Sequence, residues 1–366
     1  MKGMELLCNS IILEKRAAYM AKITINQIAE ELNLSRNTIS KVLNQKGGVS
    51  EKTEQLVLNR AKQMGYKQLE MAALEEEQEI IRNGKSLLLV TSHIPMNQHF
   101  GVRALDAFQK KIAREGYRVE IEVVTEEEMR MNQAPRGMED DRIDGIVCIE
   151  MFDKEYSTFL CETKKPILFI DSAVEIDERF TNLDLILMEN QNSISILVHK
   201  MIDAGYRKFG FVGDKDHCRS FHERWEACDR ALMKAGISGF EKGSVCALDQ
   251  EKYSDYHWMC ERIKELEMLP DVFFCANDEI AVTLIRALRE MGLIVPEDVK
   301  VVGFDDMPVA ALSNPTLTTV RINSDAIGMI AADLLLSRIQ NKKLPSRYTY
   351  VQTTLVFRES TGILHE

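Results

Sequence analysis

The sequence predicts a small all-α helix-turn-helix domain followed by a larger α/β domain of two doubly wound lobes. Two observations predict this arrangement. Three short amphipathic segments occupy residues 22–67, and apolar strand-like segments alternate with amphipathic helices over residues 86–366. Such alternation is typical of sheets whose faces are covered by helices. At 366 residues the chain also exceeds one ordinary core, which favours several domains.

The charge of the chain divides between these two parts. The formal net charge is −11, yet residues 22–68 contain eight Lys or Arg and only four Asp or Glu. Local charge, and not the sum over the chain, decides attraction to nucleic acid. A small basic module is therefore joined to a large acidic one.

The basic module predicts three short helices. The first covers residues 25–32, where apolar residues recur at helical spacing. A turn follows, and Ser35 is a suitable N-cap for a second helix. A glycine pair then interrupts the chain before Ser50, which caps a third helix. Helix, short turn and helix in this order predict a helix-turn-helix unit, whose second helix enters the DNA major groove.

The second helix carries the residues that suit contacts with bases. Its spacing buries Ile39 on one side and turns Arg36, Asn37, Ser40 and Lys41 outward. Arg and Lys suit the paired acceptors of guanine, and Asn suits the acceptor–donor edge of adenine. The alternative is an ordinary three-helix bundle with a solvated polar face.

The stretch ITINQIAEELNLSRNTISKVLNQKGGVSEKTEQLV resembles the N-terminal DNA-binding domain of the lactose-repressor (LacI/GalR) family. The resemblance implies that Arg36, Asn37 and Lys41 contact bases, whereas Thr38 and Ile39 face the core or the backbone. Positions that mostly hold phosphates in the family fall on Thr24, Asn26, Ser35, Ser40, Asn44, Ser50, Thr53 and Tyr66.

Residues 1–21 are expected to be an N-terminal extension. The resemblance places a natural start at Met20, so the preceding residues are interpreted as an upstream translation artefact or a disordered tail, with an extra helix as the alternative. The early apolar run is short and is interrupted by Glu5, unlike a secretion signal. No apolar run is long enough to span a bilayer, and a cytoplasmic protein is expected.

Residues 68–85 are expected to form an acidic hinge. In the family a short helix at this place enters the minor groove, and Leu74 is the candidate wedge. This chain lacks the usual proline, and its EEEQE run opposes an approach to phosphates. A solvated helical linker is therefore the alternative to an inserting hinge.

The acidic remainder, residues 86–366, predicts the effector-binding and dimerisation domain with its two lobes. Parallel doubly wound sheets bind ligands at the carboxyl ends of their strands. Strands are expected over residues 86–92, 118–124, 143–150, 165–171, 207–213, 271–277 and 299–306, and helices over residues 101–117, 224–236 and 278–292.

The segments DVFFCANDEIAVTLIRALREMGLIVPEDVKVVGFDD and LVFREST are similar to the effector domain of the same family, which has a periplasmic-binding-protein-like fold. The resemblance implies that Asp171, Arg224, Asn277 and Asp305 bind the effector. Carboxylates accept hydrogen bonds from hydroxyl groups while Arg and Asn donate, which suits a polyhydroxylated ligand. For each residue the alternative is a strand-end cap of the next helix. Asp306 is expected to make a local cap.

Other side chains are candidates for the same pocket. Phe221, Trp225 and Trp258 could stack on a sugar ring, with helix packing as the alternative. His99 and Phe100 lie in the loop after the first strand, where the family lines its pocket.

These features predict a ligand-responsive transcriptional regulator and not an enzyme. Nucleophile-elbow, phosphate-loop, zinc-protease and dinucleotide motifs are absent from the sequence, and the eight cysteines show no metal-binding spacing. We expect no catalytic residue, metal or cofactor. The expected protein is a repressor that binds a near-palindromic DNA operator as a homodimer, without a membrane, under control of a small sugar-like effector. The alternative is a sugar-binding receptor or transport component without a DNA-binding role.

Overall fold

The computed structural model describes residues 23–43, 49–64, 66, 84–93, 100–176, 180–248 and 250–362. Contacts divide the chain into two units, Met1–Gly84 and Lys85–Glu366. The predicted N-terminal extension and all but the end of the predicted hinge lie outside the described residues. None of the described helices is both long and apolar enough to cross a membrane.

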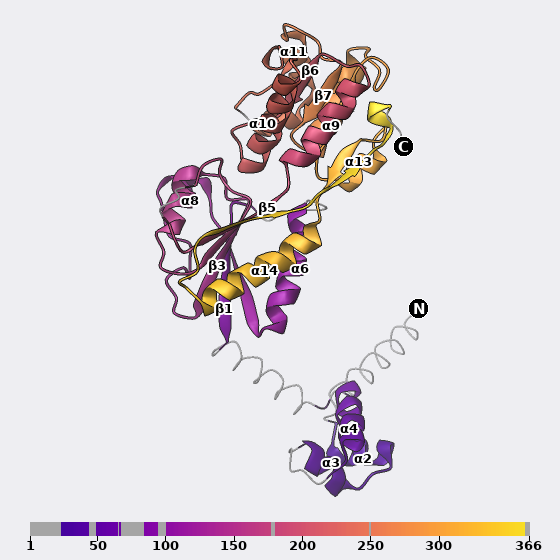
Figure 1. The fold of residues 1–366 in the computed structure, drawn as a ribbon. Coiled ribbons are helices and arrows are strands. Elements are labelled where there is room, and N and C mark those ends of the chain that lie inside the picture. The colour runs from indigo at the N-terminus through magenta and orange to yellow at the C-terminus, as the bar shows by residue number, and fades with distance from the viewer. Residues whose placement is uncertain are drawn as a thin grey trace, which may run out of the picture. The chain divides into compact units, whose positions relative to one another are not determined.

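The described residues of the first unit form the helices α2 (Ile25–Leu32), α3 (Arg36–Leu43) and α4 (Glu51–Gln63) (Figure 1). Thr24 and Gln27 form a reciprocal capping box at the start of α2, which satisfies amide groups that a helix leaves unpaired. Asn33 ends this helix in the left-handed conformation, with φ of 52°, and turns the chain toward α3. The buried core of the unit consists of Ile28, Ala29, Ile39, Val42, Val57, Ala61 and Tyr66.

The second unit begins with a lobe built on a six-stranded parallel sheet, here the first lobe. Its strand order is β10-β5-β4-β3-β1-β2. The strands are β1 (Lys85–Thr91), β2 (Tyr117–Val123), β3 (Ile143–Ile149), β4 (Ile167–Ile170), β5 (Leu183–Met188) and β10 (Arg347–Val351). The helices are α6 (Phe100–Arg114), α7 (Glu126–Arg130), α8 (Lys154–Cys161) and α14 (Ser324–Gln340).

The second lobe carries a parallel sheet of order β6-β7-β8 and an antiparallel pair, β11-β9. The strands are β6 (Phe209–Val212), β7 (Val272–Cys275), β8 (Lys300–Val302), β9 (Thr319–Arg321) and β11 (Thr354–Val356). The α-helices are α9 (Gln191–Asp203), α10 (Arg219–Lys234), α11 (Tyr256–Lys264), α12 (Asp278–Glu290) and α13 (Pro308–Leu312). Short 3₁₀ turns are η1 (Glu241–Gly243), η2 (Gln250–Ser254) and η3 (Glu359–Thr361).

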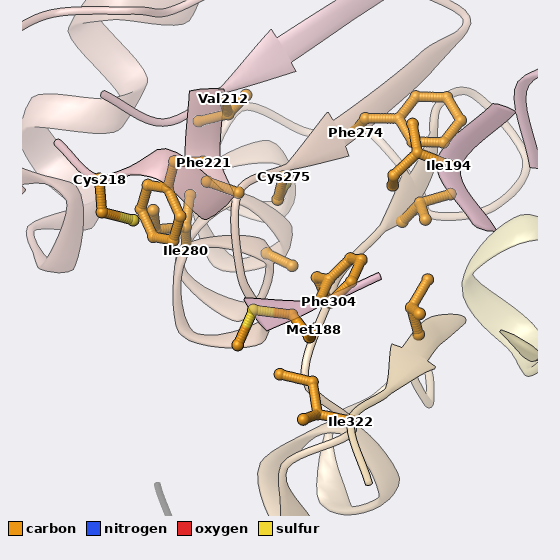
Figure 2. Close-up of a cluster of buried hydrophobic side chains, with 14 of the residues drawn as sticks. Met188, Ile194, Val212, Cys218, Phe221, Phe274, Cys275, Ile280, Phe304 and Ile322 are labelled. Atoms are coloured by element: carbon orange, nitrogen blue, oxygen red, sulfur yellow. The ribbon is translucent and has the colours of Figure 1, made fainter. Parts of the chain in front are cut away.

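Within the described residues, the chain passes between the lobes three times. It leaves the first lobe after β5, returns after β9 and leaves again after β10. As a result α14 and β10, which come late in the sequence, belong to the first lobe (Figure 1). One buried apolar cluster continues through both lobes, and Figure 2 shows the part of it that includes Met188 and Phe304. These observations confirm the predicted fold class of a helical domain followed by a two-lobed α/β domain.

A buried ion network fastens the late elements to the first sheet. The carboxylate of Asp184, on β5, accepts five hydrogen bonds from Arg338 of α14 and Arg347 of β10, at 2.6–3.1 Å. Asp184 and Arg338 are at most 1% exposed. Burial alone would raise the pKa of Asp184, but the hydrogen bonds from the two arginines lower it below its usual value. The carboxylate is therefore charged and matched by cations.

Replacement of Asp184 by alanine should destabilise the second unit by about 3–5 kcal/mol, because it leaves the buried Arg338 guanidinium without a counter-charge. Urea unfolding monitored by circular dichroism measures this loss. Asp106→Ala is the control, since Asp106 pairs with Lys110 on the exposed surface and such pairs contribute little. Equal stabilities of the two variants would contradict the role given to Asp184.

Candidate functional site

In the first unit, α3 presents a polar face opposite a buried one. Ile39 and Val42 are buried in the core of the three helices. Arg36, Asn37 and Lys41 are exposed on the other side of the same helix. The structure therefore brings together, on one open surface, the three residues predicted to contact bases.

Several residues predicted to hold phosphates cap helices in the structure. The hydroxyl of Ser35 accepts a hydrogen bond from the Thr38 amide at 3.0 Å, and that of Ser50 accepts one from the Thr53 amide at 3.3 Å. Thr24 caps α2. These caps lie at helix N-termini, where amide groups and the helix dipole favour an anion. A phosphate contact at these positions stays a prediction.

The remaining predicted DNA contacts differ in exposure. Asn26 is exposed in the first turn of α2, and Ser40 is half-buried on α3. Tyr66 lies in the core of the unit, so little of its surface is open to DNA. Asn44 lies outside the described residues.

In the second unit, a cavity of about 260 Å³ lies between the two lobes. We call it the interlobe cavity. The four residues predicted to bind the effector all line it: Asp171, Asn277 and Asp305 follow strands, and Arg224 lies on α10. The described lining residues are His93, Glu150, Phe152, Asp171, Met188, His217, Cys218, Ser220, Phe221, Arg224, Asn277, Glu279 and Asp305.

Arg224 is held rigidly in the wall of the interlobe cavity. This side chain of α10 is 2% exposed. Its Nε donates to Asn190 at 3.0 Å, its Nη1 donates to the Ala276 carbonyl at 2.5 Å, and its guanidinium stacks 3.6 Å from the ring of Phe304. Its Nη2 lies 3.7 Å from a carboxylate oxygen of Asp305. The guanidinium thus reaches the cavity in one fixed orientation.

Asn277 and Asp305 approach the interlobe cavity from the ends of the second lobe's strands. The side-chain oxygen of Asn277 accepts a hydrogen bond from the Ile280 amide at 2.9 Å and so caps α12. The alternative prediction for Asn277, a cap of the next helix, is therefore correct for this oxygen. The cap leaves its amide nitrogen for another partner. Asp305 follows β8 with φ of 114°, a backbone conformation that is costly for a residue with a Cβ.

Asp171 follows β4 and is only 3% exposed. Its φ of 60° is also left-handed, and its carboxylate accepts from the Ser172 amide at 2.8 Å. Burial raises the pKa of this carboxyl, although hydrogen bonds from Ser172 and Ser220 and the charge of Arg224 oppose the shift. Asp171 and Asp305 thus both combine a left-handed backbone with a place in the lining of the interlobe cavity.

Several lining residues were not predicted from the sequence. Glu150 ends β3 with φ of 54°, is 3% exposed and pairs with Nε2 of His93. The ring of His217 packs edge-on against Phe152 across the lobes, with centroids 4.9 Å apart. Burial lowers the pKa of His217 to about 4, so the imidazole is neutral near pH 7. Only the position of Glu150 at a strand end could have indicated its role from sequence.

Other candidates have different surroundings from those expected. Asp306 does not cap a helix: its carboxylate accepts from Arg321 and Arg358 at 2.6 and 2.5 Å. Neither Trp225 nor Trp258 is among the residues that line the interlobe cavity. The ammonium group of Lys215 lies 4.3 Å from the ring centroid of Trp225, and Trp258 packs against Tyr253.

Three candidates for the pocket remain: His99, Phe100 and Phe221. His99 lies outside the described residues, and nothing is described of the Phe100 side chain. Phe221 does line the interlobe cavity.

A further buried carboxylate, that of Asp278, directly follows the lining residue Asn277 in the sequence. Asp278, the first residue of α12, is fully buried and accepts from the Thr319 hydroxyl at 2.6 Å and the Met307 amide at 2.7 Å. Burial, and then the nearby charge of Asp305, raise the pKa of Asp278 to about 8. This carboxyl joins α12, α13 and β9 beneath Asn277 and Asp305.

Residues 24–68 match the family described as bacterial regulatory proteins of the lacI family, and residues 198–361 match the periplasmic binding protein-like domain. Together the two matches cover more than half of the chain. The lacI match lies in the helical first unit, and the periplasmic-binding-protein match lies in the two-lobed second unit that follows it. The chain belongs to the LacI family. It is therefore a DNA-binding transcriptional regulator with an effector domain, and the receptor or transport alternative is not favoured.

Relatives of this LacI-family chain match it almost from end to end. It is 23% identical over 347 residues to the transcriptional repressor MelR of Bacillus subtilis, covering 93% of this chain and 98% of the relative. It is 27% identical over 342 residues to the transcriptional repressor PurR of Klebsiella pneumoniae, covering 93% and 97%. These relatives are regulators and not enzymes.

Solved structures share the fold of the LacI-family chain. A lac repressor dimer bound to operator and an anti-inducer has a TM-score of 0.66 and 21% identity, covering 93% of this chain and 99% of that one. The complex of the transcriptional regulator CelR with cellobiose has a TM-score of 0.65 and 21% identity, covering 93% and 100%.

Asp278→Asn should change how stability depends on pH. An acid whose pKa is raised on folding binds its proton more tightly in the folded state, so its contribution is present below about pH 4 and is lost as the pH rises toward 8. Urea unfolding at pH 5, 6.5 and 8 should show wild-type stability falling relative to Asp278→Asn. Asp325→Asn, at a half-exposed carboxylate, is the control. Parallel pH profiles of wild type and Asp278→Asn would contradict the assignment.

Proposed function

We propose that this regulator is a repressor that binds a near-palindromic operator as a homodimer and responds to a small polar effector, a sugar or sugar derivative. One observation carries the effector assignment: Asp171, Arg224, Asn277 and Asp305 converge on one cavity between the lobes. Acceptors and fixed donors in such a cavity suit adjacent hydroxyl groups. Its volume of about 260 Å³ lies just below the ~300–1,000 Å³ of common ligand pockets, which favours a ligand near monosaccharide size.

The proposed division of labour assigns residues 22–67 to DNA binding, residues 68–85 to the hinge and residues 86–366 to effector binding and dimerisation. Exposed Arg36, Asn37 and Lys41 on α3 support base contacts in the major groove. A DNA-binding role also supports a cytoplasmic location.

The position of the cavity supports control by ligand. Because the lobes are joined by three chain crossings and line the cavity together, a ligand that contacts both lobes favours one arrangement of the second unit over others. The relatives give this proposal context, since CelR was solved with cellobiose and the lac repressor with operator and anti-inducer. Whether the effector releases or promotes DNA binding depends on which arrangement it favours.

Arg36→Ala and Lys41→Ala should each weaken binding to an operator obtained by selection from random duplexes. Loss of a bidentate base contact by Arg36 should cost about 1–3 kcal/mol and relax preference at one base position. Fluorescence anisotropy against the selected site and its single-base variants measures both effects. Arg60→Ala removes the same charge from α4 and should leave base preference unchanged. Wild-type affinity in both α3 variants would refute the assignment of this face.

Asp171→Asn should abolish the response to effector while operator affinity in its absence stays within two-fold of wild type. Asparagine keeps the size of the side chain and tolerates the left-handed backbone, so the fold is retained. Thermal shift of the full chain against a panel of mono- and disaccharides identifies a binding sugar, and titration of wild type and variant then gives both affinities. Arg36→Ala should retain the thermal shift. A ligand that binds Asp171→Asn as tightly as wild type would place its site elsewhere.

A further inference from the structure

A buried glutamate directly precedes Arg224 on α10. Glu223 is 5% exposed and is not among the described residues that line the interlobe cavity. A carboxylate removed from water is costly unless hydrogen bonds replace the water. Its Oε1 accepts from the Tyr350 hydroxyl at 2.7 Å and from Arg219 Nε at 3.2 Å. Its Oε2 accepts from Asn190 Nδ2 at 2.9 Å, so each carboxylate oxygen meets a defined donor.

The donors to Oε1 hold the glutamate from both lobes. Tyr350 lies on β10 of the first lobe. Burial, and then the hydrogen bond to Glu223, raise the pKa of Tyr350 to about 12, so the hydroxyl keeps its proton at neutral pH and donates. Arg219, one turn before Glu223 on α10, supplies the matching positive charge, and its amide donates to the Ser172 carbonyl at 2.8 Å. With Oε1 held in this way, Oε2 is directed toward Asn190.

Asn190 connects this carboxylate to Arg224. It lies between β5 and α9, is fully buried, and does not use its side chain to cap α9. Its Nδ2 donates to Glu223, while its Oδ1 accepts from Arg224 Nε at 3.0 Å. A side-chain amide has one donor end and one acceptor end, whereas a carboxylate only accepts and a guanidinium only donates. A reversed amide would set two acceptors against each other at Glu223 and two donors against each other at Arg224.

We propose that Glu223 is a positioning residue for the effector site: it fixes the amide of Asn190, which in turn fixes the guanidinium of Arg224 in the cavity wall. The Ala276 carbonyl restrains Nη1 of this guanidinium, but the Nε edge depends on Asn190. Because Glu223 also accepts from Tyr350, the orientation of Arg224 is anchored to a strand of the first lobe. The use of this orientation by a ligand rests on the proposed function of the cavity.

An amide at position 223 tests this chain of hydrogen bonds. In Glu223→Gln the two donors to Oε1 retain the oxygen, so the nitrogen faces Asn190, whose amide must reverse and present a donor to Arg224. The Arg224 Nε–H then loses its acceptor and should exchange with solvent about ten-fold faster, as expected for the loss of a hydrogen bond of a charged group. NMR of the deuterated full chain with ¹⁵N-labelled arginine measures this exchange, and Arg224→Lys identifies the signal. Glu226→Gln, the same charge change at a half-exposed position of α10, should leave the rate unchanged.

A second substitution separates positioning from packing. Asn190→Asp, added to Glu223→Gln, moves the carboxylate from position 223 to position 190. There one oxygen can accept from the new amide and the other from Arg224 Nε. Exchange of the Arg224 Nε–H should return close to its wild-type rate. An unchanged rate in Glu223→Gln, or a faster rate that Asn190→Asp does not restore, overturns the proposal, because the glutamate would then act only through packing.

Tyr350→Phe replaces Glu223→Gln if that variant fails to fold, as judged by circular dichroism. It removes one of the two bonds that hold Oε1, so a smaller acceleration of the same exchange is expected. Tyr348→Phe makes the same chemical change two residues earlier on β10 and should cause none. Equal exchange rates in the two tyrosine variants would then overturn the proposal.

Sugar binding distinguishes failure of this proposal from failure of the proposed function. Glucose, galactose, ribose and cellobiose are titrated into the full chain by calorimetry. A sugar that binds wild type should bind Glu223→Gln about ten-fold more weakly and regain affinity when Asn190→Asp is added. A sugar that binds every variant equally while the Arg224 exchange changes supports the positioning and refutes the role of Arg224 in the proposed function. Absence of binding by all four sugars counts against the proposed function alone, because the exchange is measured without ligand.

Discussion

One buried carboxylate holds together parts of the second unit that are far apart in sequence. Asp184 on β5 binds Arg338 of α14 and Arg347 of β10, more than 150 residues later. These two elements complete the first lobe only after the chain has built most of the second. The lobes can therefore face each other across the cavity only if this late return is fixed, and two charged side chains at full burial fix it.

The interlobe cavity also depends on elements that are far apart in sequence. Parallel strands direct their carboxyl ends toward one edge, so β3, β4 and β8 each deliver an acidic residue to the interlobe cavity. Arg224 comes from a helix, and its guanidinium needs the hydrogen bonds of Asn190 and Ala276 to keep one orientation. Three acidic residues that line the cavity thus have positive φ, and Asp278, which does not line it, is held by hydrogen bonds from Thr319 and Met307.

Local sequence predicted strands such as β1, β3 and β7, which are largely apolar runs, because burial on both faces of a parallel sheet requires such runs. It missed β5, although that strand is buried along its whole length. It did not predict β10, whose alternating exposure gives no such run and whose place beside β5 is set by long-range pairing. The resemblance supplied four cavity residues. Glu150 was not predicted because its place in the cavity lining depends on how the folded lobes face each other, and Asp306 was misread because its partner Arg358 is remote in sequence.

The three crossings between the lobes have a genetic consequence. Neither lobe is one continuous stretch of the gene, because the first lobe needs residues 324–351 and the second needs residues on both sides of them. A single recombination event between relatives cannot exchange one lobe intact. Exchange of one lobe alone would need more than one crossover, whereas one continuous stretch, residues 85–366, carries both lobes and the whole lining of the cavity together.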